Sequence, residues 1–435
     1  MARNPLLPHF REAYQNLSLD PLVTPEAIAR FRVEYDRETL ENLQQEIEDS
    51  PRKECKVVFT GHRGCGKSTL LASLKQELEA SGELFVVLFS ISDLVEMSDV
   101  NHVNILFAIA MQLMGAADEQ NIGIKDSTRK EIERWFTEEV VTEASEFKAQ
   151  VEAGFNFKAL FAWFKGVLQT SSTVRREIKQ RFEKNISELS QIIDLLATVI
   201  EDAAGKEIVV IIDDIDKLDM STVRDVFYTH VKALFQPSIR LVMTMPIAAL
   251  REGDIFATLQ TETNNKVIPM AVLKLISKGD KRLPDARPKP EYVEIFRDLL
   301  VKRMDARLLM AEAIPDIVFY SGGVLRELVR IVAKCCNLCL REVRRQPENT
   351  EIRITPEVVE QAVQALRLDF ELPLGARDYE TLQRVHHKFA PEDPNEQAFL
   401  DLLHSLHVLE YRNAEIWYDL HPIIVEILRR KELIQ

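Results

Sequence analysis

Residues 57–71 read VVFTGHRGCGKSTLL, and this stretch decides the fold. The β-branched and aromatic run from Val57 to Phe59 predicts a buried strand. Three glycines and the pair Lys67-Ser68 follow, and an amphipathic helix is expected from near Thr69. The pattern is G-x-x-x-x-G-K-S between a strand and a helix, which is the context that a phosphate-binding loop requires. The alternative is a glycine turn with an incidental lysine, and it would need both flanking elements to fall here by chance.

The residue types of this loop match the chemistry of a bound phosphate chain. Glycines let backbone N–H groups come close to an anion, and the new helix directs its positive end at the same place. Lys67 would place a point charge on the β- and γ-phosphates, and Ser68 would hold Mg²⁺. The predicted nucleotide-binding residues are Gly61, His62, Arg63, Gly64, Cys65, Gly66, Lys67, Ser68 and Thr69.

Composition limits the class of protein. The chain has 435 residues, enough for two or three domains, and its net charge of −14 argues against a nucleic-acid coat. Five cysteines without regular spacing do not indicate a disulfide framework and fit a reducing compartment. Met1 to Phe10 lacks an apolar core of signal-peptide length, and no apolar run is long enough to span a membrane. We therefore expect a cytoplasmic protein without an integral membrane segment.

Strands alternate with helices along the first two thirds of the chain, which predicts a parallel sheet covered on both faces. Strands are expected at 55–60, 84–90, 208–212, 239–244 and 267–275, and helices at 25–50, 67–80, 221–235, 291–312, 315–320, 323–344 and 355–370. A long stretch of several helices is expected at about 99–204. The last 60 residues predict two helices (377–389 and 395–405), two short strands (408–411 and 416–419) and a helix from 422. The predicted domains are an N-terminal arm with a leading helix (1–50), a P-loop domain (51–277) with a helical insertion (about 99–204), a helical lid (290–372) and a winged-helix-like module (376–435).

Two adjacent acids follow the apolar strand at 208–212. Asp213 is the expected Mg²⁺ carboxylate, and Asp214, which leaves the strand in another direction, is the candidate to polarise the attacking water. The alternative is a pair of turn acids at a strand end, whereas Asp216 and Asp219 are expected to cap the next helix. Thr244 ends strand four, and its hydroxyl would point at the γ-phosphate and the attacking water if that strand lies between strands one and three. The alternative for Thr244 is a residue chosen for β-propensity.

Arg326 follows two glycines, Gly322 and Gly323, at the start of a helix. It lies on a polar stripe with Arg330, opposite apolar residues. An arginine one turn into a helix can reach a phosphate across a cleft and bind it with two hydrogen bonds. The alternative for Arg326 is a solvated helix face.

Taken in order, the Gly61–Thr69 loop, the Asp213-Asp214 strand, Thr244 and Gly-Gly-x-x-Arg326 resemble AAA+ ATPases, and most of all their origin-initiator and STAND branches. This resemblance covers roughly residues 28 to 372. It implies an α/β P-loop NTPase three-layer sandwich with strand order 5-1-4-3-2, a helical lid and a C-terminal winged helix. It also implies binding of ATP and Mg²⁺, with Lys67, Asp214, Thr244 and Arg326 as catalytic or sensing residues and Ser68 and Asp213 as metal ligands. The stretch around Phe31 resembles the segment that packs the adenine.

Two departures from that family favour a switch over a motor. The second acid after strand three is Asp214, where most AAA+ members have a longer glutamate, so slow hydrolysis is expected. No arginine that could act in trans is identified, since Arg240 and Arg251 flank strand four but match no motif. We expect a homo-oligomer that engages a protein effector or client.

Three functional hypotheses remain open at this point. The first is an ATP-binding, slowly hydrolysing switch that controls assembly or partner engagement. The second is an ATP-regulated DNA-binding regulator or initiator-type loader that uses the basic helix at 171–184 or the wing. Nucleic acid is not favoured as a partner, because residues 377–435 hold seven basic and eleven acidic side chains. The third is a sensor in bacterial defence that acts through a separate effector.

Three other sets of residues have a structural interpretation. Cys335, Cys336 and Cys339 lack a fourth zinc ligand and are expected to be small buried residues. Four histidines of the C-terminal region are expected at the edge of the core: His386, His387, His404 and His407. The aromatic segment 155–168 is expected to pack within the helical insertion, with partner or membrane-surface docking as the alternative.

Overall fold

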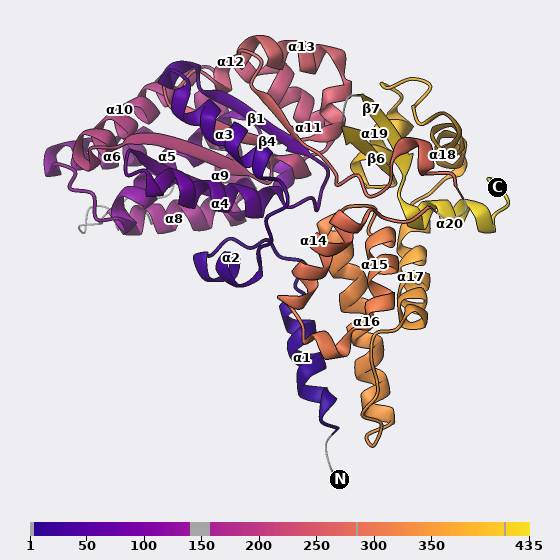
Figure 1. The fold of residues 1–435 in the computed structure, drawn as a ribbon. Helices are drawn as coiled ribbons and strands as arrows, with labels where there is room; N and C mark the ends of the chain where they lie inside the picture. Colours follow the sequence, from indigo (N-terminus) through magenta and orange to yellow (C-terminus); the bar gives the residue numbers. More distant parts are fainter. Residues whose placement is uncertain (1–3, 140–156, 284–285, 413–414) are drawn as a thin grey trace. The chain divides into compact units, whose positions relative to one another are not determined.

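The computed structural model describes residues 4–139, 157–283, 286–412 and 415–435 (Figure 1). The chain forms two compact units, which are described separately below. The first unit contains Met1–Arg37, Gly61–Leu70 and Met270–Gln435, and the second contains Glu38–Thr60 and Leu71–Pro269. The four predicted domains divide the chain at other points, since 1–50 and 51–277 each include residues of both units, and they remain a prediction.

A five-stranded sheet forms the centre of the second unit. Its strands are β1 (Lys56–Gly61), β2 (Leu84–Ser90), β3 (Glu207–Asp213), β4 (Arg240–Pro246) and β5 (Val267–Met270). The strand order is β2-β3-β4-β1-β5, which is 5-1-4-3-2 when read from the β5 edge. Strands β2, β3 and β4 pair in parallel, with Ser90 opposite Asp213 at the end of the register. The predicted α/β class with a parallel P-loop NTPase sheet is confirmed.

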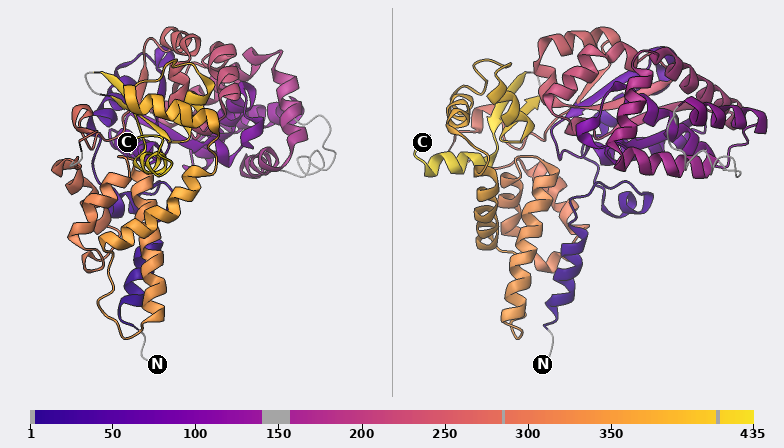
Figure 2. Two further views of the ribbon diagram at one scale, coloured as in Figure 1. Left: turned by 90° about the vertical axis from the view of Figure 1, so that its right-hand side faces the viewer. Right: turned by 180° about the vertical axis from the view of Figure 1, so that it is seen from behind.

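Helices cover both faces of this sheet, as the complete burial of β1 and β4 requires (Figures 1 and 2). Alternate residues of the sheet, among them Val58, Val210 and Met243, pack with the buried residues of α5 in one apolar core. The helices of this unit are α3 (Arg37–Asp49), α4 (Lys67–Ala80), α5 (His102–Glu119), α6 (Asp126–Glu139), α8 (Phe157–Thr170), α9 (Ser172–Phe182), α10 (Ile186–Ala204), α11 (Met220–Arg224), α12 (Val231–Leu234) and α13 (Gly253–Glu262), where α3 and α4 each begin in the first unit.

The single helix expected over 221–235 is wrong. The chain instead forms α11, a π-helical turn over Asp225–Thr229, and α12. The backbone N–H of His230 donates to the carbonyl of Asp225, five residues back, so the turn is wider than an α-helical one. This widening brings Asp225 and His230 onto the same side of the segment.

Residues 140–156 of the helical insertion lie outside the described residues. They include the first two residues of the aromatic segment 155–168. Phe164 and Leu168 are buried in the core of this unit. Arg175, one of five basic residues in the expected basic helix, is 5% exposed and lies 2.6 Å from Asp99. Part of that positive charge is therefore neutralised inside the protein.

The first unit is mostly helical. It contains α1 (Leu6–Asn16), α2 (Pro25–Phe31), α14 (Pro290–Val301), α15 (Ile314–Tyr320), α16 (Leu325–Arg345) and α17 (Pro356–Glu371). The helix expected over 291–312 is too long, because α14 ends at Val301 and two 3₁₀ turns follow. Asn4 and Asn16 hydrogen-bond to Asn349 and Arg303, so the N-terminal arm is fixed to these helices.

The C-terminal elements of this unit are α18 (Ala376–Lys388), α19 (Gln397–His404), β6 (Val408–Arg412), β7 (Ile416–Leu420) and α20 (Pro422–Arg430). Strands β6 and β7 pair antiparallel, with Tyr411 opposite Trp417. Buried Asp419 on β7 accepts from Arg282 at 2.7 Å, which ties the segment before α14 to the hairpin. The order of elements is the expected one, and the winged-helix interpretation remains a prediction.

The cysteines of α16 are buried, as expected, and burial raises the pKa of the Cys335 thiol. His386 and His407 are also buried, and His407 hydrogen-bonds to the carbonyl of Phe370. Among the described residues, no helix combines the length and the hydropathy that crossing a membrane requires.

Candidate nucleotide-binding site

Lys67 is the first residue of α4, and its ammonium group turns back over the loop that precedes it. Its Nζ donates to the carbonyl of Gly61 at 3.0 Å and to that of His62 at 2.9 Å, and the side chain is buried. These bonds hold the charge over the curve of the loop, where a phosphate chain would be bound. Thr69, two residues further, accepts from the backbone N–H of Leu22 at 3.0 Å.

Gly64 and Gly66 are needed for close contacts within the first unit. Both have positive φ, +80° and +102°. A Cβ on Gly64 would lie 2.6 Å from the Cβ of Arg326, and a Cβ on Gly66 would lie 2.0 Å from the hydroxyl of Tyr35. A residue with a side chain therefore fits at neither position without displacing a neighbour.

Arg326 lies directly against the phosphate-binding loop. Its backbone N–H donates to the carbonyl of Gly64 at 3.0 Å, and its Cδ would be 3.4 Å from a Cβ on Gly64. The side chain is half-buried, and its guanidinium makes no hydrogen bond or ion pair with the residues that the structure describes. Five N–H donors of a permanent cation are thus placed beside the loop.

Tyr35 is a loop contact that the sequence did not reveal. Its hydroxyl donates to the carbonyl of Cys65 at 2.8 Å and lies against Gly66. Phe31, which the resemblance associates with adenine, instead packs under the guanidinium of Arg303, 5.3 Å from the ring centroid. The aromatic residue of this segment that touches the loop is therefore Tyr35.

His62 links the loop to the β6–β7 hairpin. Its Nε2 accepts from the backbone N–H of Glu410 at 2.8 Å. Burial, with a smaller effect from the positive charge of Lys67, lowers the pKa of His62 to about 3, so the ring is neutral at physiological pH. A neutral ring adds no positive charge to the loop and serves as an acceptor that fixes its position. The remaining predicted loop residues, Arg63 and Ser68, are half-buried.

In the second unit, Asp213 and Thr244 end neighbouring strands. Asp213 is the last residue of β3, and Thr244 lies near the end of β4, which is between β3 and β1 as the sensor role requires. In parallel strands these ends share one edge of the sheet, which is the edge where such folds bind ligands. Asp213, Asp214 and Asp216 offer carboxylate oxygens within 4.8 Å of one another.

Asp216 was expected to cap a helix, and this is wrong. It lies buried in the 3₁₀ turn after β3, beside Asp213, while Asp219 alone caps α11 by accepting from the backbone N–H groups of Ser221 and Thr222. An oxygen-rich cluster of this kind suits Mg²⁺, so Asp216 joins the candidate metal ligands.

Both carboxylate oxygens of Asp214 are engaged. Oδ2 accepts from the hydroxyls of Ser90 at 2.7 Å and Ser92 at 2.9 Å, and Oδ1 lies 2.7 Å from Nζ of Lys217. Burial raises the pKa of Asp214, but these hydrogen bonds outweigh it, and the pKa lies below its usual value. A carboxylate with a low pKa and occupied oxygens is a weak base toward water.

Thr244 is completely buried, and its hydroxyl oxygen accepts from the backbone N–H of Ile215 at 3.1 Å. This bond fixes the chain that follows Asp214. The backbone of Asp214 itself is left-handed, with φ of 69°. Asp214 was recognised from its place after a strand, but Ser90, Ser92 and Lys217 carry no motif that would predict their contacts with it.

Comparison with protein families gives one match. Residues 37–244 match the model described as KAP family P-loop domain, a span that contains the loop, Asp213-Asp214 and Thr244. The chain has a P-loop NTPase fold. No curated protein matches it in sequence.

Solved structures of low sequence identity also align with the chain. The Walker-type ATPase PABY2304 of Pyrococcus abyssi is 13% identical, with 95% of this chain and 99% of that chain covered and a TM-score of 0.43. Cdc6p from Pyrobaculum aerophilum is 12% identical, with 96% and 98% covered and a TM-score of 0.42. Because both TM-scores lie below 0.5, neither likeness carries an argument about fold or function.

Proposed function

We propose that this protein is an ATP-dependent molecular switch that binds ATP with Mg²⁺ and hydrolyses it slowly. The observation that supports the proposal is the contact between Gly64 and Arg326 in the first unit, where the backbone N–H, Cβ and Cδ of Arg326 at the start of α16 lie against the phosphate-binding loop. A cation there distinguishes a triphosphate from a diphosphate by the extra charge at the γ-position. The bound nucleotide would then set the position of α16.

Binding is assigned to the loop. Residues Gly61 to Thr69 would surround the phosphates, with Lys67 on the β- and γ-phosphates. Ser68 and Asp213 would hold the Mg²⁺, with Asp216 as a further carboxylate near Asp213. The chemistry that Mg²⁺ supplies is neutralisation of charge on the transferred phosphoryl group.

Slow hydrolysis follows from the state of Asp214. To polarise a water molecule this carboxylate has to give up a hydrogen bond from Ser90 or Ser92, or its ion pair with Lys217. Each such bond to a charged group contributes about 1.5–3 kcal/mol, and its loss is added to the barrier of the chemical step. Thr244, which already fixes the backbone at Ile215, would act as the γ-phosphate sensor through its O–H.

Nucleotide binding is tested first with Lys67→Ala and fluorescent ATP. Loss of the ammonium removes charge-assisted hydrogen bonds of about 1.5–3 kcal/mol each, so affinity for ATP should fall on the order of 100-fold. The matched control is Lys75→Ala, which removes a half-buried lysine from the same helix. Equal ATP affinity in Lys67→Ala and Lys75→Ala would reject the site.

The switch is tested by particle size. Moving an equilibrium between two states from 1:99 to 99:1 requires about 5.5 kcal/mol of differential binding. We expect a non-hydrolysable ATP analogue to change the oligomeric state, or the binding of a protein effector, in the wild type and not in Lys67→Ala. Light scattering and electron microscopy with and without the analogue measure this change.

The DNA-binding alternative has less support in the structure. Within the basic helix α9, Arg175 is buried against Asp99, and Arg181 lies 3.9 Å from Glu188. Binding to duplex DNA that weakens steeply with salt would favour this alternative, and no binding at low salt would end it.

A further inference from the structure

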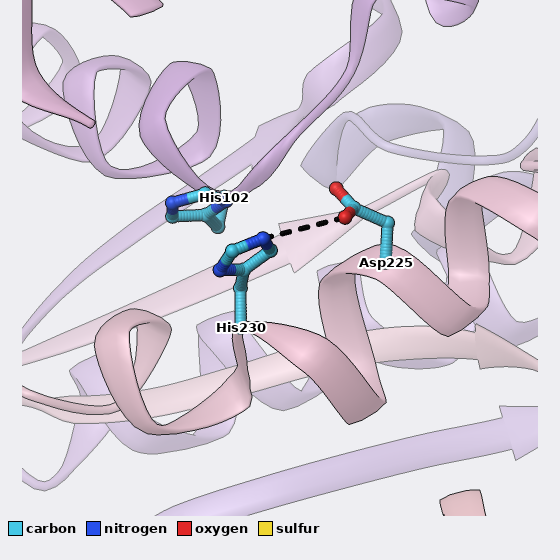
Figure 3. Close-up of side chains that lie close together, drawn as sticks. All are labelled: His102, Asp225 and His230. Carbon is cyan, nitrogen blue, oxygen red and sulfur yellow. Dashed lines mark ion pairs between the residues drawn. The ribbon is translucent and has the colours of Figure 1, made fainter.

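Two histidines and an aspartate meet in the second unit (Figure 3). His102 is the first residue of α5, and its neighbour Asn101 caps that helix. Asp225 begins the π-helical turn, and His230 follows its end. None of the three residues belongs to the motifs that predicted the nucleotide site.

The π-helical turn explains why Asp225 and His230 are close. Its five-residue hydrogen bond places residues 225 and 230 on the same side, so His230 Nε2 lies 3.4 Å from Asp225 Oδ1. The imidazole of His102 stacks on that of His230, with centroids 3.9 Å apart and planes inclined by 16°. One ligand atom from each of the three residues lies within 4.8 Å of the other two. π-turns inside helices are frequent at functional sites.

The imidazole of His102 has an unsatisfied buried nitrogen. The residue is 3% exposed, and Nδ1 has no hydrogen-bond partner among the described residues. Leaving a buried polar atom unpaired costs about 1–3 kcal/mol of folding free energy. A ligand that binds to this nitrogen would recover that free energy. Burial, and next the neighbouring His230, lower the pKa of His102 to about 4, so its ring is neutral and can offer a lone pair.

We propose that His102, Asp225 and His230 form a binding site for a divalent transition-metal ion, and that Zn²⁺ fits it best. Two imidazoles and one carboxylate are a common zinc ligand set, with a water molecule in the fourth position. The two rings stack in this structure, so binding requires them to tilt until their lone pairs converge on one ion. Mg²⁺ and Ca²⁺ prefer ligand sets made of oxygen, and this set suits them poorly.

The site is accessible from solvent. The side chains of His230 and Asp225 are 32% and 43% exposed. Asp225 also lines a cavity of about 420 Å³ together with Lys179, Ser221 and Thr222. A metal ion can therefore reach the site without unfolding of the unit, and a ligand in the cavity would approach the ion from the side of Asp225.

The experiment is isothermal titration of the full chain with Zn²⁺ alone, after treatment with a chelator and without nucleotide. We expect one tight Zn²⁺ per chain. In His230→Gln the affinity should fall by more than the 10–100-fold that loss of an outer-shell partner costs, because a direct ligand is removed. The matched control, His387→Gln, changes an exposed histidine on α18 and should bind Zn²⁺ as the wild type does.

A second variant, Asp225→Asn, and a second metal ion, Co²⁺, test the site if His230→Gln misfolds. Asp225→Asn preserves shape and removes the carboxylate charge, and it should also weaken Zn²⁺ binding more than tenfold. Co²⁺ should give the absorption bands of a tetrahedral site in the wild type and in Lys67→Ala, so the result does not depend on the nucleotide site. Equal Zn²⁺ affinity in the wild type and in folded His230→Gln, or no tight binding in the wild type, would overturn the proposal.

Discussion

The phosphate-binding loop of the first unit and the acidic strand end of the second unit differ in how far their polar groups are already satisfied. In the loop, the backbone is held by Tyr35 and Arg326, while the guanidinium of Arg326 has no partner among the described residues. At the strand end, both oxygens of Asp214 are occupied by Ser90, Ser92 and Lys217.

This difference indicates that the molecule is better prepared to bind a nucleotide than to cleave it. The loop offers a fixed backbone shape with cationic groups beside it, and Lys67 has to turn from the carbonyls of Gly61 and His62 to reach a phosphate. The strand end has to break existing hydrogen bonds before Asp214 can act on water. A protein of this kind would remain in its triphosphate-bound state long enough to signal.

The strongest test of the fixed shape of the loop is Gly64→Ala. The left-handed backbone costs an alanine about 1–2 kcal/mol, and contact with the Cβ of Arg326 adds about 1–3 kcal/mol, so we expect about 3 kcal/mol of destabilisation. The control is Gly82→Ala, with nearly the same φ of +79° but nothing within 4 Å of the added Cβ, which should cost about 1 kcal/mol. Urea denaturation measures both, and equal losses would show that the Gly64–Arg326 contact does not form.

A smaller effect is expected from Tyr35→Phe. This change removes the hydrogen bond to the carbonyl of Cys65 and should cost about 1 kcal/mol of unfolding free energy. Tyr14→Phe, at a site 45% exposed, should be neutral. If the two variants have the same denaturation midpoint, Tyr35 does not hold the loop, and only the contact with Arg326 would fix its backbone.

The smallest effect concerns the acidic strand end. Because the pKa of Asp214 is depressed in the folded state, its ionised form stabilises the fold above the unfolded pKa of about 4, and this contribution is lost as the pH falls through the folded value. Lys217→Ala should therefore cost about 0.5 kcal/mol at pH 7 and nothing at low pH, where Asp214 is protonated.

Denaturation of Lys217→Ala as a function of pH, with exposed Lys53→Ala as the control, measures this difference. The same variant frees one oxygen of Asp214, so its ATP turnover should rise relative to the control. A turnover that falls would mean that Lys217 assists the reaction. That result would contradict the claim that the contacts of Asp214 slow hydrolysis.

The sequence predicted the elements whose signals are local. Val57 to Phe59 and the glycines gave the strand, the loop and the start of α4 within one or two residues, because each depends on its immediate neighbours. Asp213 was predicted at a strand end for the same reason. The order of the strands came from the resemblance to a family and not from the residues themselves.

The contacts that define the site could not be predicted, because they join residues far apart in the chain. Gly64 meets Arg326 and His62 meets Glu410 only after α16 and the β6–β7 hairpin have folded. The hydrogen bonds of Asp214 depend on its left-handed backbone and on the register of β2 beside β3. The break in the helix expected over 221–235, and with it the meeting of Asp225 and His230, has no signal in the periodicity of apolar residues.

The most direct test of the account is the ratio of ATP affinity to ADP affinity in Arg326→Ala, compared with the wild type and with the control Arg341→Ala on the same helix. The account predicts that ATP binding weakens on the order of 10–100-fold in Arg326→Ala, as expected for loss of a charge-assisted hydrogen-bond pair, while ADP binding changes little. An unchanged ratio would contradict the claim that this guanidinium reads the γ-phosphate.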